Sequence, residues 1–233
     1  MKNLIICGFV SVLMLTACKK EAKITPYMPP KTTDVVYPAD SASFSLDGKT
    51  YILGGAHSLT TGNTKADRKV DSFVNYTNYH VSESSDTTFY YETHEFNAPG
   101  MDLDVSFFKK YATKDMVHGL IYYPSQITNL FQPGSYQYGT DFNRENATNG
   151  VGLAVNHSWQ TYSDQAIVVP VLIGPASESN AHFQILSFKK MAEDDLAIQY
   201  VLQAKFDATL FDKDGNSKQL TDGYARINIA IAK

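Results

Sequence analysis

Hydrophobic and polar side chains alternate along several stretches of the chain, and a period of two is typical of β-strands with one buried face. Apolar residues stand at every second position over 101–107. The same alternation runs over 196–210 and returns over 225–231. We expect each stretch to be a strand with one face in the core and the other in water.

Turn residues separate these segments. Asp47-Gly48 lies between alternating residues on both sides, and Asp-Gly readily adopts the positive φ angles of a two-residue hairpin. Asp212–Asn216 turns the chain between the last two long strands. Weaker strand candidates are 73–81, 87–96, 117–123, 151–157, 166–173 and 182–188, and the one short helical candidate is 125–131. About ten to twelve short strands with little helix predict an all-β fold, an antiparallel β-sandwich or β-barrel.

The N-terminus has the pattern of an export signal. A single lysine, Lys2, precedes an uncharged apolar run over 4–15, and Lys19 and Lys20 follow. A membrane-spanning helix needs about 20 apolar residues, so this run predicts a cleaved signal peptide.

The end of that run resembles the signal of bacterial lipoproteins. Leu15-Thr16-Ala17-Cys18 has the aliphatic residue, the small residues and the cysteine of that family's cleavage site. The resemblance implies that residues 1–17 are removed and that Cys18 carries the lipid. It further implies an outer-membrane location, with the domain facing either the periplasm or the cell exterior. The other cysteine, Cys7, lies in the signal, so the mature chain has no thiol for a disulfide or a Cys-based metal site.

Residues 18–40 are expected to form a tether. This stretch is polar and holds four of the nine prolines, and proline favours extended, semi-rigid spacers. A single all-β domain is expected over 41–233. The chain has 20 Lys and Arg against 24 Asp and Glu, so it offers no broad basic surface and nucleic acid is not an expected partner.

No motif for catalysis or for a cofactor is found, and we expect a protein that is not an enzyme and has neither metal nor cofactor. His94-Glu95 lacks the second histidine of a zinc protease helix. Asp102 and Asp104 share a strand face and would hold a cation only if a third oxygen approached; a solvated strand face is the other interpretation. Paired carboxylates of the glycosidase kind are defined by distance in space, so the sequence leaves them open.

Aromatic residues are the one compositional excess, with 15 Tyr, 13 Phe and one Trp. Tyrosine forms strands well and spans the boundary between core and water, which accounts for most of them. The functional hypothesis is a face on which rings stack against a glycan or an envelope protein. Its candidate ligand-binding aromatics are Trp159, Tyr162, Tyr136 and Tyr138.

Three turn regions also resemble small Bacteroidetes lipoproteins of uncharacterised function: the hairpin 44–49, the turn 133–136, and the closing segment 206–215 followed by 220–224. This resemblance implies an outer-membrane context and an all-β fold, and it implies no activity. The expected function is a lipid-anchored binding or structural module of the cell envelope. One alternative is a surface enzyme or accessory protein acting on polysaccharide; the other is a lipocalin-like carrier of a small apolar ligand.

Overall fold

The computed structural model describes residues 39–55, 62–74, 78–118, 122–139, 142, 149–162 and 182–233, with the backbone alone over 66–83. Cys18, the signal peptide, the expected tether up to residue 38 and the candidate strand 166–173 lie outside these residues. Asp40, expected as the last tether residue, is the first residue of β1.

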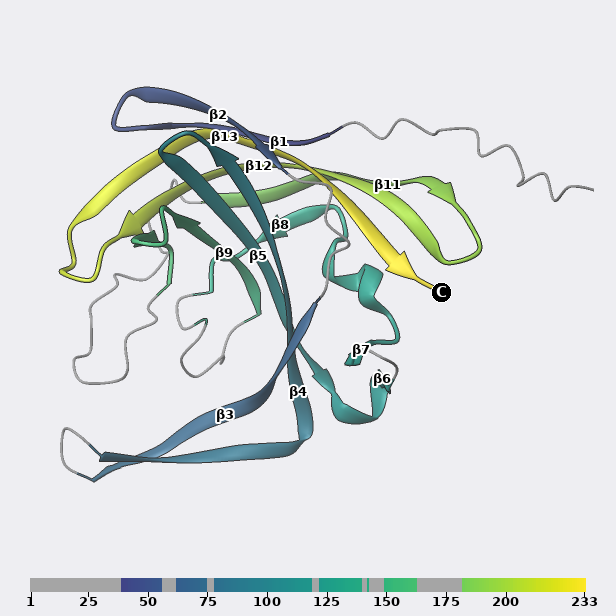
Figure 1. The fold of residues 1–233 in the computed structure, drawn as a ribbon. Coiled ribbons are helices and arrows are strands. Elements are labelled where there is room, and N and C mark those ends of the chain that lie inside the picture. The colour runs from purple at the N-terminus through teal and green to yellow at the C-terminus, as the bar shows by residue number, and fades with distance from the viewer. Residues whose placement is uncertain are drawn as a thin grey trace, which may run out of the picture. The chain divides into compact units, whose positions relative to one another are not determined.

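The described chain consists of antiparallel strands joined by turns and two short 3-10 helices (Figure 1). In chain order the elements are β1 (Asp40–Leu46), β2 (Lys49–Gly55), β3 (Asn63–Val74), β4 (Asn78–Ala98), β5 (Met101–Ala112), η1 (Thr113–Asp115), β6 (Met116–His118), β7 (Tyr122–Pro124), η2 (Ile127–Leu130), β8 (Gly134–Tyr136), β9 (Gly150–Val155), β10 (Trp159–Gln160), β11 (His182–Glu193), β12 (Ala197–Phe211) and β13 (Ser217–Ala232). The all-β prediction is confirmed.

The sheet closes into a barrel of eight strands, which decides between the two architectures expected. Around the ring the order is β1, β2, β4, β5, β9, β10, β12, β13 and back to β1. Gln160 of β10 pairs with Phe211 of β12, and β13 pairs with β1. The ring therefore follows chain order throughout, as in up-and-down barrels.

Two further strands widen one end of the barrel. β11 pairs with the same edge of β12 that meets β10, from Asp207 back to Ile198. β8 pairs with β11, and Tyr138, just after β8, bridges to Val151 of β9. Between β12 and β9, the barrel is therefore closed by β10 alone at one end of these strands. At the other end it is closed by both β11 and β8. We call these the narrow end and the wide end.

Apolar side chains on the inner faces of the strands form the core. The strands predicted from alternation contribute to it, with Leu103, Val105 and Phe107 of β5 fully buried. Rings of different strands meet inside, because Phe183 of β11 contacts both Phe107 and Phe206 of β12 at centroid distances of 5.7 and 5.8 Å. Phe183 and Phe206 are paired neighbours, whereas the contact of Phe183 with Phe107 links two strands that do not pair with each other.

A second, smaller cluster lies on the outside of β4, β5 and β9. It consists of Phe89, Phe108, Phe142, Ala154 and Tyr162. The rings of Phe108 and Phe142 stack at 4.5 Å with an angle of 3° between their planes. The expectation that the second face of β5 is solvated is therefore wrong at Phe108, because residues distant in sequence cover it.

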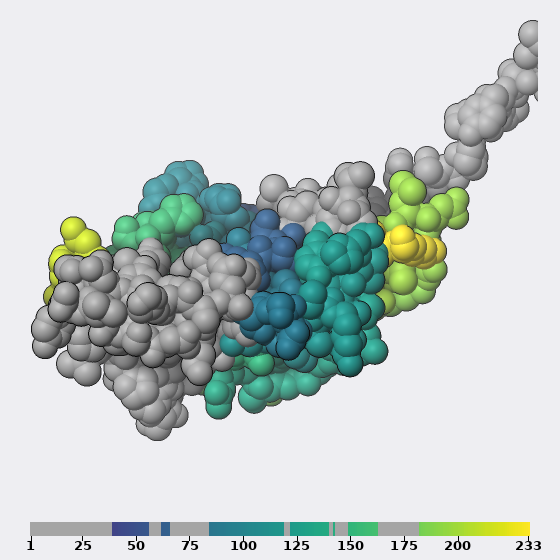
Figure 2. Space-filling model, turned by 90° about the horizontal axis from the view of Figure 1, so that it is seen from below, coloured from purple at the N-terminus to yellow at the C-terminus, as the bar shows by residue number. Residues whose placement is uncertain are grey.

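The segment between β5 and β8 closes over the wide end and contributes Leu130 and Phe131 to the main core. The ring of Phe131 contacts Phe107 at 5.3 Å. Part of this segment, coloured teal, forms a continuous surface in Figure 2. The single strand predicted over 117–123 is instead two short paired strands, β6 and β7, and the helix predicted over 125–131 is a turn followed by the short η2.

Some predicted boundaries are also displaced. Asp47 and Gly48 have φ angles of 52° and 76°, as the predicted hairpin requires. The candidate strand 73–81 spans the end of β3 and the start of β4, which are separate strands. Leu196, predicted as an inward residue, precedes β12 and is 81% exposed. It belongs to the turn between β11 and β12, where its backbone N–H and that of Ala197 donate to the carboxylate of Asp194.

Candidate functional site in the barrel interior

Two ionisable side chains project from β4 into the core. Tyr90, Glu92, His94 and Phe96 occupy alternate positions and are all buried, and the residues between them, 91, 93 and 95, are exposed or half-buried. Glu92 is 1% exposed and His94 is 3% exposed. Charged residues are rarely fully buried unless they are paired, so the partners of Glu92 decide how this site is interpreted.

One oxygen of Glu92 has a hydrogen-bond partner and the other has none. The Tyr90 hydroxyl donates to Oε1 of Glu92 at 2.6 Å. Oε2 lies 3.8 Å from Nε2 of His94, which is beyond hydrogen-bond distance. Both of these atoms are without a hydrogen-bond partner, and so is the buried hydroxyl of Tyr111 on β5. We call Tyr90, Glu92, His94 and Tyr111 the interior polar cluster.

Aromatic rings surround the interior polar cluster. Tyr90 and Tyr111 meet edge to face with centroids 6.3 Å apart, and His94 meets Phe107 in the same way at 5.9 Å. Gly62, just before β3, lies so close to Tyr90 that a Cβ built there would overlap the Tyr90 hydroxyl. The polar atoms therefore face one another inside a largely apolar enclosure.

Burial shifts the ionisation of the cluster toward its neutral forms. It raises the pKa of Glu92 to about 7, although the hydrogen bond from Tyr90 opposes the shift. It lowers the pKa of His94 to about 4. The pKa of Tyr111 is raised, first by burial and then by the negative charge of Glu92. At neutral pH the imidazole is uncharged and the carboxyl is close to its midpoint.

This arrangement has the properties of a binding site for a small polar group. An uncharged imidazole nitrogen, a phenol oxygen and a carboxylate oxygen can all accept hydrogen bonds. Most buried polar atoms in proteins have a partner, so three unpartnered atoms in one cluster require an explanation. Within the described part of the chain, no group of three or more His, Cys, Asp or Glu side chains is arranged to hold a metal ion.

The aromatic residues selected from the sequence lie elsewhere, and two of them are buried. Tyr138 is 5% exposed, and its hydroxyl donates to backbone carbonyls of His182 and Asp207. Tyr162 is 8% exposed, and its ring meets Phe142 at 5.1 Å in the outer cluster. Stacking of a ligand needs a free ring face, so these two residues serve the fold and not a recognition surface.

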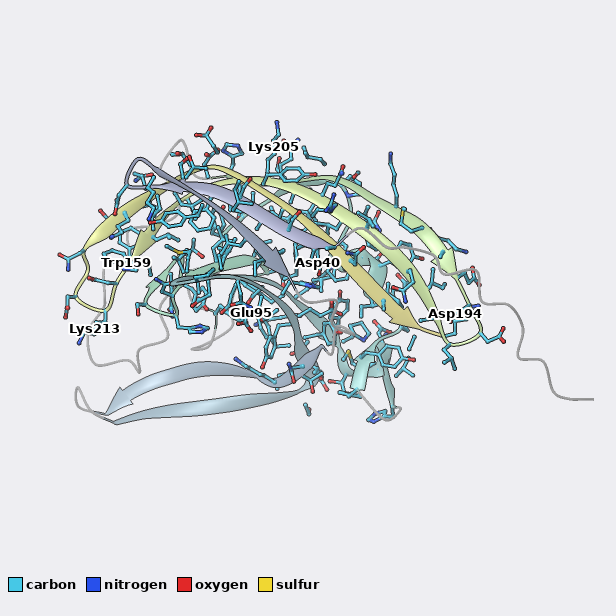
Figure 3. All side chains as sticks on the ribbon, turned by 45° about the horizontal axis from the view of Figure 1, so that its top comes forward. Asp40, Glu95, Trp159, Asp194, Lys205 and Lys213 are labelled. Atoms are coloured by element: carbon cyan, nitrogen blue, oxygen red, sulfur yellow. The ribbon has the colours of Figure 1, made fainter. Side chains whose placement is uncertain are left out.

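The other two are half-buried and lie apart. Trp159 belongs to β10 at the narrow end, and Figure 3 shows it near the turn that carries Lys213. The Nζ of Lys218 lies 4.5 Å from the Trp159 ring centroid. Tyr136 belongs to β8 at the wide end, and its hydroxyl donates to the carbonyl of Gln132 at 2.8 Å. The structure does not combine the four residues into one face.

An imidazole lies beside the carboxylates of Asp102 and Asp104, and Glu95 of β4 is the direct cross-strand neighbour of Asp104. Nδ1 of His157 lies 3.3 Å from Asp104, and Nε2 lies 3.9 Å from Asp102. His157 stands in the turn between β9 and β10 with a positive φ of 51°. The His157 side chain is mostly exposed, whereas the two carboxylates are partly buried, and burial raises the pKa of Asp104.

The interior polar cluster is absent from the candidates chosen by sequence. In the sequence, His94 stands out only beside Glu95 in an incomplete zinc motif, and Glu92 belongs to no motif. One signal was available, because Glu92 and His94 share the phase of Tyr90 and Phe96 in a period-two segment. An ionisable pair on the apolar face of a strand indicates a buried site.

Comparisons with known proteins provide no relative for this chain. No protein-family model, no curated protein and no solved structure matches it. Within the residues that the structure describes, no helix is both long and apolar enough to cross a membrane.

Proposed function

We propose that this protein is a lipid-anchored binding module of a bacterial outer membrane, and that its ligand binds at the interior polar cluster. The lipid on Cys18 would hold the molecule at the membrane, and the proline-rich residues 18–40 would separate the barrel from the lipid. The sequence Leu15-Thr16-Ala17-Cys18 at the end of an apolar run supports the anchoring.

The observation that carries the binding role is the set of unpartnered atoms on Glu92, His94 and Tyr111. Leaving a buried polar atom without a hydrogen bond costs about 1–3 kcal/mol, and apolar side chains of similar shape would avoid that cost. These three atoms contribute no hydrogen bond to the stability of the barrel. A ligand that hydrogen-bonds to them would recover the lost interactions.

The architecture is consistent with this role. A closed barrel of eight strands has an interior just large enough to be filled by side chains or to hold one small ligand. Here Phe107, Phe183 and Phe206 occupy the middle. The cluster therefore favours a small ligand with a polar group over a long apolar one, which modifies the lipocalin-like alternative.

Binding without catalysis is favoured over the polysaccharide-cleaving alternative. Hydrolysis of a glycosidic bond generally uses two carboxyl groups about 5–10 Å apart. The interior polar cluster contains one carboxyl group, that of Glu92, beside an imidazole and two phenols.

The proposed lipid anchor on Cys18 is tested by metabolic labelling. A fatty-acid analogue should label the wild-type protein and leave Cys18→Ser unlabelled, and only the wild type should fractionate with outer membranes. Equal labelling of both proteins would contradict the proposal. Protease treatment of intact cells would then tell a domain facing outward from one facing the periplasm.

Ligand binding at the interior polar cluster is tested with four small probes of similar size: n-butylamine, n-butanol, butyrate and tetramethylammonium. At least one of them should raise the melting temperature of the full chain, because a ligand that binds only the folded state stabilises it. The same probe should leave Glu92→Gln unchanged. If none of the four distinguishes Glu92→Gln from the wild type, the proposed interior site is wrong.

A further inference from the structure

We propose that the interior polar cluster binds a primary ammonium group, with Glu92, His94 and Tyr111 each accepting one of its three N–H donors. This inference rests on the proposed function and specifies the ligand class. A primary ammonium has three donors and no acceptor, which matches three unpartnered atoms that can all accept.

Charge also favours a cation. Glu92 is the only acidic side chain of the cluster, and no lysine or arginine of the described residues forms an ion pair with it. Lys109 is half-buried and lies with its Nζ 5.6 Å from the ring centroid of Tyr111, and not in an ion pair with Glu92. A buried carboxylate needs a positive partner to offset its desolvation, and a ligand ammonium would supply that charge.

The neutral state of His94 fits the same ligand. Burial lowers the pKa of this imidazole to about 4, so at neutral pH it adds no positive charge that would repel a cation. Its unpartnered Nε2 lies 3.8 Å from Glu92 Oε2. A nitrogen placed between the two atoms can donate to both, whereas the atoms are too far apart to bond to each other.

The rings around the cluster are suited to a cation as well. Tyr90, Tyr111 and Phe107 present aromatic surfaces in contact with the cluster or with one another. Aromatic faces attract ammonium groups, and the attraction strengthens when water is excluded. A carboxylate ligand would instead bring a second negative charge beside Glu92.

Other ligand classes fit less well. A quaternary ammonium would use the rings but leave all three acceptors unpaired, because it has no N–H donor. An alcohol has one donor and would satisfy one of the three atoms. An ordered water has two donors, and it would explain the cluster without any ligand.

The test compares the four probes on the full chain at pH 8, where Glu92 is mostly ionised. We expect n-butylamine at saturation to raise the melting temperature by about 5 °C, with smaller effects of n-butanol, butyrate and tetramethylammonium. Glu92→Gln should abolish the amine effect. Tyr111→Phe removes one acceptor and should weaken amine binding about tenfold. Glu95→Gln is the matched control, since Glu95 is the next glutamate on β4, three positions after Glu92, and is exposed.

A spectroscopic measurement makes weak binding visible. With ¹³C-labelled glutamate, titration with n-butylamine should shift the carboxyl resonance of Glu92 and leave that of Glu95 in place. If n-butanol, butyrate or tetramethylammonium acts through Glu92 more strongly than the amine, the ammonium inference is wrong and the interior site stands. If no probe moves the Glu92 resonance, the cluster holds water only and both proposals fail.

Discussion

Glu92 and His94 stand two residues apart on β4, with Oε2 of the carboxyl group 3.8 Å from Nε2 of the imidazole in the buried interior. Burial acts on them in opposite directions, because it disfavours the charged form of each. The pKa of Glu92 rises from 4.5 to about 7, and that of His94 falls from 6.5 to about 4. At a pH between its two pKa values, Glu92 is therefore protonated in the folded state and ionised in the unfolded chain. His94, between its own two pKa values, is neutral in the folded state and protonated in the unfolded chain.

These two shifts make opposite contributions to stability as a function of pH. Between about pH 4.5 and 7 the folded state holds more protons at Glu92, so this group lowers stability as pH rises. Between about pH 4 and 6.5 the unfolded state holds more protons at His94, so this group raises stability as pH rises. In the wild type the two slopes should largely cancel from about pH 4.5 to 6.5.

Single substitutions should separate the two contributions to the pH dependence of the free energy of unfolding. Relative to the wild type, Glu92→Gln should gain about 2–3 kcal/mol of stability as pH rises from about 4.5 to 7. His94→Gln should lose a similar amount as pH rises from about 4 to 6.5. Urea unfolding at a series of pH values measures both. Curves that stay parallel to the wild type would show that neither group is buried as described.

Gly62 should be required for the closed arrangement over Tyr90. A Cβ at position 62 would overlap the Tyr90 hydroxyl, which is fully buried and donates to Glu92. Gly62→Ala should therefore destabilise the protein by about 1–3 kcal/mol, the usual cost of overpacking. Gly54→Ala is the control, because a Cβ there has nothing within 4 Å and should change stability by less than about 0.5 kcal/mol. Equal effects of the two substitutions would contradict the close packing at Tyr90.

The fold class could be predicted because alternation and turn residues are local signals. The hairpin at Asp47-Gly48 and the inward residues of β5 follow from neighbours along the chain. Closure of the barrel could not be predicted in this way. It depends on the pairing of Gln160 with Phe211, and on β2 pairing with β4 after the chain has passed through β3.

The candidate site was harder to predict for a related reason. Phe89, Tyr90 and Tyr91 are three consecutive aromatic residues, so the alternation in this part of β4 does not show which face is inward. The outer cluster buries Phe89 as completely as the core buries Tyr90. The burial of Glu92 depends on β5 and the segment that follows it, and the burial of Tyr162 depends on Phe142; neither contact is encoded locally.

The stability of the barrel should depend on hydrogen bonds made by Ala39 and Asp40 at the start of β1. The guanidinium of Arg226 donates twice to the carbonyl of Ala39, at 3.2 and 2.8 Å. The buried carboxylate of Asp40 accepts from the backbone N–H of Asn228 at 2.7 Å. A chain beginning at Ser41 should therefore be less stable than one beginning at Ala39, by about 2–4 kcal/mol for the lost hydrogen bonds to charged groups. Identical melting temperatures would show that the domain begins at Ser41.

Tyr162 provides the test of whether the outer aromatic cluster is structural. Its ring meets Phe142 at 5.1 Å, and Gly152 leaves it room, since a Cβ there would lie 3.0 Å from the ring. Tyr162→Ala should cost about 3 kcal/mol, because removing a buried ring leaves a cavity, and should lower the melting temperature by roughly 6–12 °C. Ile52→Ala is the control, since Ile52 is 77% exposed on β2 and should change stability by less than about 0.5 kcal/mol. If Tyr162→Ala melted like the wild type while losing retention on a glycan array, Tyr162 would be a recognition residue, and the structural role assigned to the outer aromatic cluster would be wrong.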